Sequence, residues 1–217
     1  MNSVDLAWAV GRPTIGGLAR ALTPNRNYGA DRVPLTGGIV LAFNHFSWID
    51  PPLFGAACPR TIHYVAKVEA HRVPGLGQLI RAYGTISVRR GESDREAVRL
   101  MREAVREGHA LGLFVEGTRQ LSGVPGHAHP GAAMVALQEG VPVQPAAIHG
   151  TQTWRPGNFH PASIAWGEPI DFSSLPRNAK GYREASAEIE RELRRLFDWL
   201  VLMHELGRPR DAVPPAR

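Results

Sequence analysis

The amino-acid sequence predicts an α/β fold: a single domain with a mostly parallel or mixed central sheet flanked by helices. Short apolar runs that are typical of buried strands alternate along the chain with longer stretches of helical periodicity. The length of 217 residues is ample for one hydrophobic core. Neither an internal repeat nor a flexible linker divides the sequence. One compact α/β domain is therefore the expected architecture.

The clearest strand is the apolar run IVLAF at residues 39–43, which follows a Gly-Gly pair. Strand ends present catalytic groups in many α/β proteins, so the loop that follows is expected to be functional. Two prolines close that loop and favour the start of a helix. The polar residues of the loop are Asn44, His45, Ser47 and Asp50.

The remaining elements follow from the same patterns. Further strands are expected at residues 61–65, 85–88, 111–115, 141–148 and 163–167. Helices are expected at residues 52–58, 69–83 (broken at Pro74 and Gly75), 93–107, 131–138 and 180–206. The helix at 93–107 begins with a capping box formed by Ser93 and Glu96. Residues 24–37 are expected to form turns, and residues 207–217 a frayed, flexible tail.

Residues 1–23 form an N-terminal amphipathic segment that precedes the main domain at residues 24–206. Pro13 and the Gly16-Gly17 pair predict two short helical pieces. An apolar face with Trp8 and arginines suits a helix that lies in a membrane interface. The same face suits packing on the protein's own core, and the sequence leaves both possibilities open.

Composition and charge narrow the range of partners. The net charge of +5 favours anionic headgroups or phosphate-bearing substrates. Zinc spacings, basic heptad regions and RNA-binding signatures are missing, so no nucleic-acid partner is expected. His127 and His129 have no acidic or cysteine partner at ligand spacing, so no metal is expected either. Cys58 is the one cysteine, which suits a reducing compartment. No apolar run reaches bilayer length and no secretory signal starts the sequence, so we expect a soluble or membrane-surface protein.

His45 and Asp50 are the candidate catalytic residues. They are five positions apart, which is too far for neighbours on a helix face but close enough to meet across a turn. A carboxylate bonded to one imidazole nitrogen fixes the tautomer and leaves the other nitrogen free to accept a proton. A base with an orienting carboxylate and no nucleophile suits direct activation of a substrate hydroxyl. Taken alone, this spacing more often marks a histidine that only hydrogen-bonds its own turn.

A second polar cluster, Glu116 to Arg119, follows the expected strand at residues 111–115. Gly117 permits close approach of the backbone to a ligand, and Arg119 is suited to bidentate phosphate binding. Glu116 would repel an anion unless it accepts a hydrogen bond from a glycerol hydroxyl or holds an arginine in place. The Arg89-Arg90 pair, at the end of the strand at 85–88, forms either a phosphate clamp or a solvated edge. Both polar loops follow strands, so we expect them to meet at one edge of the sheet.

Four ordered stretches resemble the sequence blocks of the PlsC-like glycerolipid acyltransferases. They are NHFSWID at 44–50, YGTISVRR at 83–90, FVEGTRQ at 114–120 and GVPVQPAAI at 140–148. The resemblance implies His45 and Asp50 as catalytic residues. It implies substrate binding by Asn44, Ser47, Arg89, Glu116, Gly117, Thr118 and Arg119. Two positions depart from the family pattern: Val115 replaces a proline, and His129 stands where many relatives have a lysine.

The function implied by the resemblance is acyl transfer from acyl-CoA or acyl-carrier protein to 1-acyl-glycerol-3-phosphate, giving phosphatidic acid. His45 would take the hydroxyl proton, Asp50 would orient His45, and Asn44 or a backbone donor would stabilise the oxyanion. No cofactor is required. The expected location is the cytoplasmic face of the membrane, as a peripheral protein. Alternatives are another lysolipid or glycerol 3-phosphate as acceptor, or a non-catalytic phospholipid-binding module. An α/β hydrolase is excluded because no G-x-S-x-G elbow is present.

Overall fold

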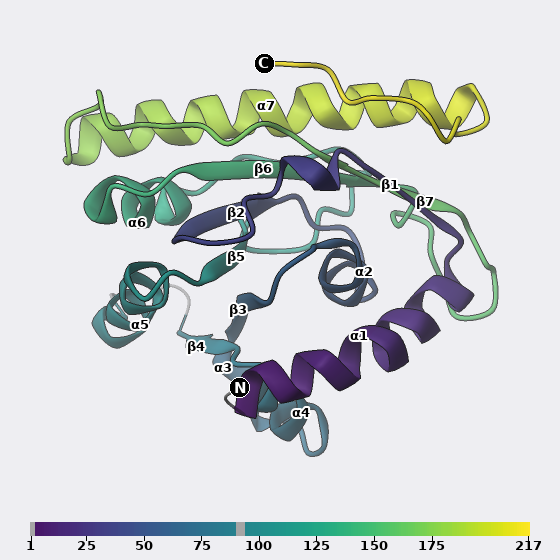
Figure 1. Ribbon diagram of the computed structural model, residues 1–217, viewed down its shortest axis with the longest axis horizontal. Coiled ribbons are helices and arrows are strands. Elements are labelled where there is room, and N and C mark those ends of the chain that lie inside the picture. The colour runs from purple at the N-terminus through teal and green to yellow at the C-terminus, as the bar shows by residue number, and fades with distance from the viewer. Residues whose placement is uncertain (1–2, 90–93) are drawn as a thin grey trace.

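The computed structural model describes residues 3–89 and 94–217. Within these residues, seven strands form one mixed sheet in the order β1-β7-β6-β2-β5-β3-β4 (Figure 1). Every neighbouring pair is parallel except β6 and β7, which run antiparallel. The strands are β1 (Asn25–Tyr28), β2 (Ile39–Phe43), β3 (Ile62–Lys67), β4 (Ile86–Val88), β5 (Ala110–Phe114), β6 (Val143–His149) and β7 (Ala162–Trp166). The predicted α/β class is confirmed.

Helices cover both faces of this sheet. They are α1 (Ser3–Leu22), α2 (Asp50–Ala57), α3 (Val68–Arg72), α4 (Leu76–Ala82), α5 (Arg95–Arg106), α6 (Gly131–Glu139) and α7 (Ala179–Glu205), with a short 3₁₀ turn at Ala30–Arg32. Helices α5 and α6 lie on one face, α2 lies on the other, and α1 lies outside α2 (Figure 1). Helix α7 spans the molecule and contributes to the core on both faces.

Strand β2 lies at the centre because all five of its residues are apolar and buried. Its side chains alternate between the faces: Val40 and Ala42 pack with α5 and α6, whereas Leu41 and Phe43 pack with α2. The Phe43 ring stacks on Phe54 of α2 at a centroid distance of 4.1 Å. Phe43 is also in register with Phe114 of β5. The loops after β2 and β5 therefore start side by side at the same edge of the sheet.

Helix α1 differs from its prediction, because it is one continuous helix of 20 residues rather than two pieces. Pro13 and the residue four before it, Ala9, are both exposed, so the hydrogen bond that proline cannot donate is lost on the water-facing side. The glycines allow close packing instead of breaking the helix. A Cβ atom on Gly16 would lie 2.7 Å from that of Ala56 in α2, and one on Gly11 would overlap the ring of Tyr83.

Three smaller expectations also change. The turn-rich region contains an edge strand, β1, which pairs with β7 in parallel. The segment after α7, expected to be frayed, is held to the core: Arg32 donates to the carbonyl of Pro214 at 2.7 Å, and Pro214 is buried. The capping box assigned to Ser93 lies outside the described residues, and the described N-cap of α5 is Asp94, which accepts from the amide of Ala97. Among the described helices, none has both the length and the hydropathy to cross a bilayer.

Candidate active site

His45 and Asp50 meet in the loop between β2 and α2. His45 Nδ1 lies 2.8 Å from Asp50 Oδ2, which also accepts from the amides of Phe46 and Ser47 at 2.7 Å each. The chain turns back at this point, because the Asp50 amide donates to the carbonyl of Ser47. Asp50 is fully buried and opens α2, where the helix dipole favours a negative charge. An oxygen that accepts three N–H groups fits a carboxylate, so Nδ1 carries the proton and Nε2 is left as the acceptor.

The imidazole of His45 is held between Asp50 and an aromatic ring. The Phe114 ring lies 4.1 Å from that of His45, centroid to centroid. Phe114 is the last residue of β5, and the register of β5 with β2 places it there. The side chain of His45 keeps 18% of its surface accessible, on the side of a cavity. Packing and the carboxylate together fix the ring while leaving it open to a ligand.

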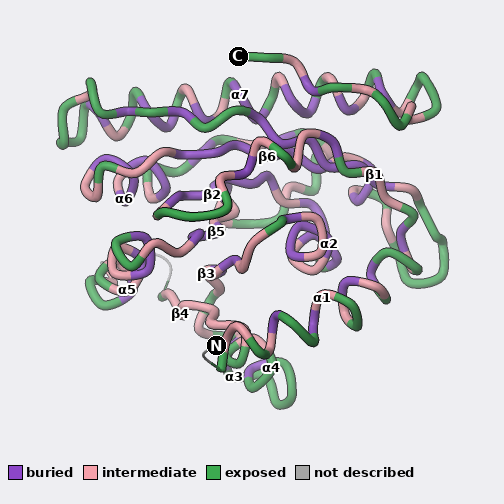
Figure 2. Tube along the Cα trace, in the orientation of Figure 1, coloured by how far each residue is buried: buried purple, intermediate pink, exposed green. Residues whose placement is uncertain are grey.

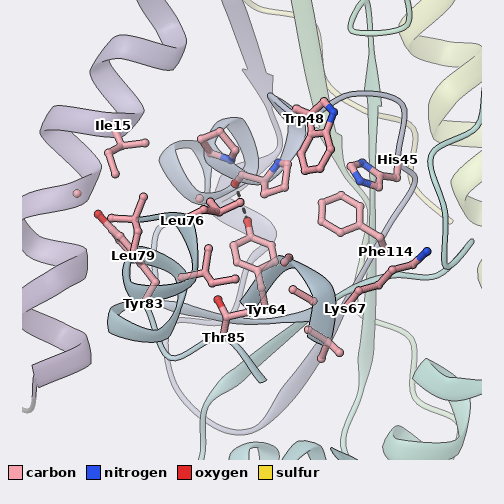
Figure 3. A pocket seen from close by; sticks show the side chains of 18 of the residues that line it. Ile15, His45, Trp48, Tyr64, Lys67, Leu76, Leu79, Tyr83, Thr85 and Phe114 are labelled. Atoms are coloured by element: carbon pink, nitrogen blue, oxygen red, sulfur yellow. Dashed lines mark hydrogen bonds between the residues drawn. The ribbon is translucent and has the colours of Figure 1, made fainter. Parts of the chain in front are cut away.

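The cavity beside His45 has a volume of about 670 Å³ and is mainly apolar. His45, Trp48 and Phe114 lie at one end, and Ile15, Leu79 and Tyr83 lie at the other (Figure 3). Its walls come from α1, α2, α4 and the carboxyl-terminal half of β3. Tyr64 also lines the cavity and is largely buried, and this burial raises the pKa of its phenol well above the ordinary value. A cavity of this size and polarity is suited to a long apolar group, and His45 lies at one end of it.

Three cations line the cavity: Arg12 of α1, Lys67 and Arg119. Arg119 follows β5, and its guanidinium carbon lies 4.5 Å from the centroid of the Trp48 ring, a cation–π distance. Thr118 lines the same part of the cavity. Lys67 ends β3, which pairs with β5, and sequence reasoning missed it. The sequence offered little signal, because Lys67 lies two positions after the strand predicted at 61–65 and its place beside β5 depends on strand pairing.

Asn44 has a structural position that differs from its expected one. Its side-chain amide donates to the carbonyl of Ile148 at 3.0 Å, and its oxygen accepts from the Ile148 amide at 2.8 Å. The residue is completely buried between β2 and β6. The expected role of Asn44 as an oxyanion donor is therefore corrected: its amide is enclosed and engaged with β6.

Glu116 also points into the protein. Its two carboxylate oxygens accept from the backbone amides of His45 and Gly126, each at 2.8 Å. The residue is 3% exposed, and burial raises its pKa from 4.5 to about 7, although those two hydrogen bonds act in the opposite direction. Gly117 beside it has a φ of +69°, a conformation that glycine adopts without strain.

The structure therefore brings the two predicted loops together, as expected, but not every predicted residue. Ser47 contributes its backbone amide to Asp50 and is largely buried. Arg89 is exposed at the end of the edge strand β4 and is not among the described residues that line the cavity. Substrate binding by Ser47, Gly117, Thr118 and Arg119 stays a prediction.

The fold is α/β, and the candidate catalytic residues lie on a loop after a parallel strand, the arrangement in which α/β enzymes commonly present their reacting groups. The Acyltransferase family model matches residues 26–149, more than half of the chain. The chain belongs to this family of acyltransferases.

Several relatives carry glycerolipid or related activities in their names. The 1-acyl-sn-glycerol-3-phosphate acyltransferase of Bacillus subtilis is 27% identical over 183 residues, covering 80% of this chain and 89% of that protein. The lyso-ornithine lipid O-acyltransferase of Pseudomonas aeruginosa is 37% identical over 106 residues, covering 48% and 40%. The crystal structure of the 1-acyl-sn-glycerophosphate acyltransferase PlsC from Thermotoga maritima aligns with a TM-score of 0.70 at 23% identity, covering 95% of this chain and 80% of that one. That similarity shows the shared fold.

Proposed function

We propose that this protein transfers a fatty acyl group from a thioester, acyl-CoA or acyl-carrier protein, to the free hydroxyl of 1-acyl-glycerol-3-phosphate. The observation that carries the proposal is the position of His45. Its Nδ1 is engaged by Asp50, and its ring opens into a large apolar cavity whose mouth carries Lys67 and Arg119. A base, an apolar space and cations converge on one point.

The chemistry follows from the tautomer. Nε2 of His45 takes the proton as the acceptor oxygen attacks the thioester carbonyl, and Asp50 stabilises the imidazolium that forms. The tetrahedral intermediate collapses, the carbon–sulfur bond breaks, and the imidazolium returns its proton to the leaving thiolate. The products are phosphatidic acid and the free thiol. No covalent intermediate with the enzyme is required.

Charge selects the acceptor. Lys67 and Arg119 come from the ends of β3 and β5, so they approach the mouth of the cavity from adjacent strands. A phosphate monoester carries up to two negative charges, which suits a forked guanidinium and an ammonium together. A zwitterionic ornithine headgroup satisfies this pair less well. A phosphate-bearing lysolipid is therefore the better acceptor.

The protein binds its lipid substrate at the membrane surface. Leu6, Val10 and Leu18 of α1 are each more than half exposed, while Trp8 and Gly16 of the same helix are buried. One face of α1 thus packs on the protein and lines the cavity, and exposed positions alternate with buried ones along the helix (Figure 2), the three apolar residues being among the exposed. Such a helix suits a membrane interface, where an acyl chain would pass from the lipid phase into the cavity.

The first experiment compares acceptors and removes the base. Purified protein is assayed with palmitoyl-CoA and, in turn, lysophosphatidate, lyso-ornithine lipid and glycerol 3-phosphate. Lysophosphatidate is expected to give the highest kcat/KM. His45→Ala is expected to abolish transfer, and Asp50→Asn to lower kcat at least ~10²-fold, the scale of a positioned proton-transfer group.

Folding is checked by thermal melting of each variant, since Asp50 is buried. Full turnover in a folded His45→Ala protein would contradict the general-base role. A preference for the ornithine lipid would move the acceptor assignment. Lipid binding without transfer to any acceptor would support the non-catalytic alternative.

A further inference from the structure

We propose that Glu116 is a positioning residue that fixes the backbone of His45, rather than a ligand of the acceptor. This inference rests on the proposed acyl transfer and concerns the same site. Its starting point is that Glu116 lies in the loop that carries Arg119, yet its carboxylate is turned away from the cavity and is 3% exposed.

The loop after β5 forms hydrogen bonds with both the amide and the carbonyl of His45. The His45 amide donates to Glu116 Oε2 at 2.8 Å, and the His45 carbonyl accepts from the Gln120 amide at 2.8 Å. Both backbone polar groups of one residue are thus bonded to one loop, 71 positions away in the sequence. This clamp, defined by Glu116, His45 and Gln120, fixes the backbone position from which the imidazole side chain projects.

Glu116 also links the clamp to the rest of the loop. Its other oxygen, Oε1, accepts from the Gly126 amide at 2.8 Å, so one carboxylate joins the catalytic loop, the start of the loop after β5, and its far side. A carboxylate is suited to this task because it offers two acceptors and no donor. A neutral glutamine would place an N–H group against one of the two amides. An aspartate would keep the charge but be one methylene too short to span both.

A second carboxylate provides a matched control. Glu190 of α7 accepts from the Ala128 amide at 3.0 Å and from His127 Nδ1 at 2.8 Å, so it anchors the same loop two residues further on. It has no bond to His45. A general loosening of the loop should follow from Glu190→Gln, whereas misplacement of His45 should follow only from changes at Glu116.

The experiment measures kinetics for Glu116→Gln, Glu116→Asp and Glu190→Gln with lysophosphatidate and palmitoyl-CoA. Both Glu116 variants are expected to lose about 10- to 100-fold in kcat, the scale of a misplaced reacting group, with KM for each substrate within about twofold of wild type. Glu190→Gln is expected to retain kcat within about twofold. A rise in acceptor KM at unchanged kcat would make Glu116 an acceptor ligand. Full activity of Glu116→Asp would show that charge, and not the bridge, is what matters.

Amide hydrogen exchange tests the clamp without any turnover. Exchange is carried out on the folded wild type and variants, and mass spectrometry then follows the segment at residues 43–50. This segment is expected to exchange at least tenfold faster in Glu116→Gln than in wild type and Glu190→Gln. Unchanged exchange there would overturn the clamp. If wild-type protein transfers no acyl group to any acceptor, the proposed function fails while this exchange comparison still decides the role of Glu116.

Discussion

The cation–π pair of Arg119 and Trp48 lies at the mouth of the cavity. The indole lies over the guanidinium at 4.5 Å, which limits the orientations that the fork adopts before a ligand arrives. Trp48 is 67% exposed, so the pair lies at the solvent-facing entrance of the cavity rather than in the core. We expect it to act on acceptor binding and not on proton transfer.

Replacing Arg119 by Ala is therefore expected to raise the acceptor KM about 10- to 100-fold, since a hydrogen bond to a charged group contributes about 1.5–3 kcal/mol. The KM of the thioester should change little. Arg119→Lys should rescue poorly, because a point charge cannot reproduce two parallel donors. Steady-state kinetics with each substrate varied in turn measures both constants.

The variant Arg89→Ala tests whether Arg89 binds the acceptor phosphate, as the sequence resemblance implies, or lies outside the site, as its position in the structure indicates. Arg89 lies at the end of the edge strand β4, outside the cavity lining, so its removal should leave the acceptor KM within about twofold. A tenfold rise would restore Arg89 as a phosphate ligand. A rise in the donor KM for Arg119→Ala would instead place Arg119 at the thioester carrier.

The sequence predicted the site where chemistry is local. His45 and Asp50 are five positions apart in one loop, so their contact depends on a single turn. Lys67 was missed because its role depends on β3 pairing with β5, which no short pattern encodes. The inward direction of Glu116 and the bonding of Asn44 to β6 also depend on partners far along the chain. The positions of Lys67, Glu116 and Asn44 thus depend on contacts between distant parts of the chain, which residue type alone does not predict.

At the scale of elements, the apolar cores of strands and helices were predicted well and the exceptions have specific causes. Strand β2 and helix α7 follow from apolar runs and from a helical stripe. The polar strand β1 was missed because an edge strand of four residues carries little apolar signal. Helix α1 was expected to break at Pro13 and at Gly16-Gly17, but it is continuous, and close packing on Ala56 requires a small residue at Gly16.

Helix α1 carries exposed apolar residues and also forms a wall of the cavity, so deleting residues 1–23 would remove both. Surface substitutions distinguish them. The triple change Leu6→Ser, Val10→Ser and Leu18→Ser is expected to weaken binding to anionic vesicles at least tenfold, because each apolar side chain contributes about 1.5–3 kcal/mol when fully buried. Vesicle co-sedimentation measures this binding, and activity on detergent-dispersed acceptor should persist.

The matched control for that prediction lies on the other side of the molecule. Leu202, Leu206 and Val213, in or after α7, are also exposed apolar residues. Their replacement by serine should leave vesicle binding unchanged. Equal loss in both triple variants would indicate non-specific adsorption, and unfolding of the α1 variant in a thermal melt would assign its exposed residues to the core.

For the whole molecule, the buried carboxyl of Glu116 makes stability depend on pH. Burial raises its pKa from 4.5 to about 7, with a smaller contribution from Asp50, while the amides of Gly126 and His45 and the charge of Arg194 act oppositely. The folded state therefore retains a proton that the unfolded chain releases above pH 4.5. Stability from this group falls as pH rises from about 4.5 to 7 and is level above that, a change of about 3 kcal/mol.

The comparison with Glu116→Gln isolates this effect, because every other group titrates in both proteins. Between pH 5 and pH 8, the free energy of unfolding of wild type should fall relative to that of the variant, as measured by urea denaturation at each pH. Parallel pH profiles for the two proteins would mean that Glu116 titrates normally, as an exposed carboxylate does.

The long-range hydrogen bonds at the end of β2 have a consequence for the order in which the protein folds and becomes active. Asn44 reaches Ile148, 104 positions away, and the His45 amide reaches Glu116, 71 positions away. Closing such large loops is costly in chain entropy and is repaid only when the intervening strands have paired. A partly folded chain can contain β2 and its turn, with Asp50 beside His45, but it lacks the long-range bonds that fix the backbone of the catalytic loop. Recovery of turnover after dilution from denaturant should consequently lag behind recovery of helical circular dichroism, which makes catalysis a reporter of the last contacts to form.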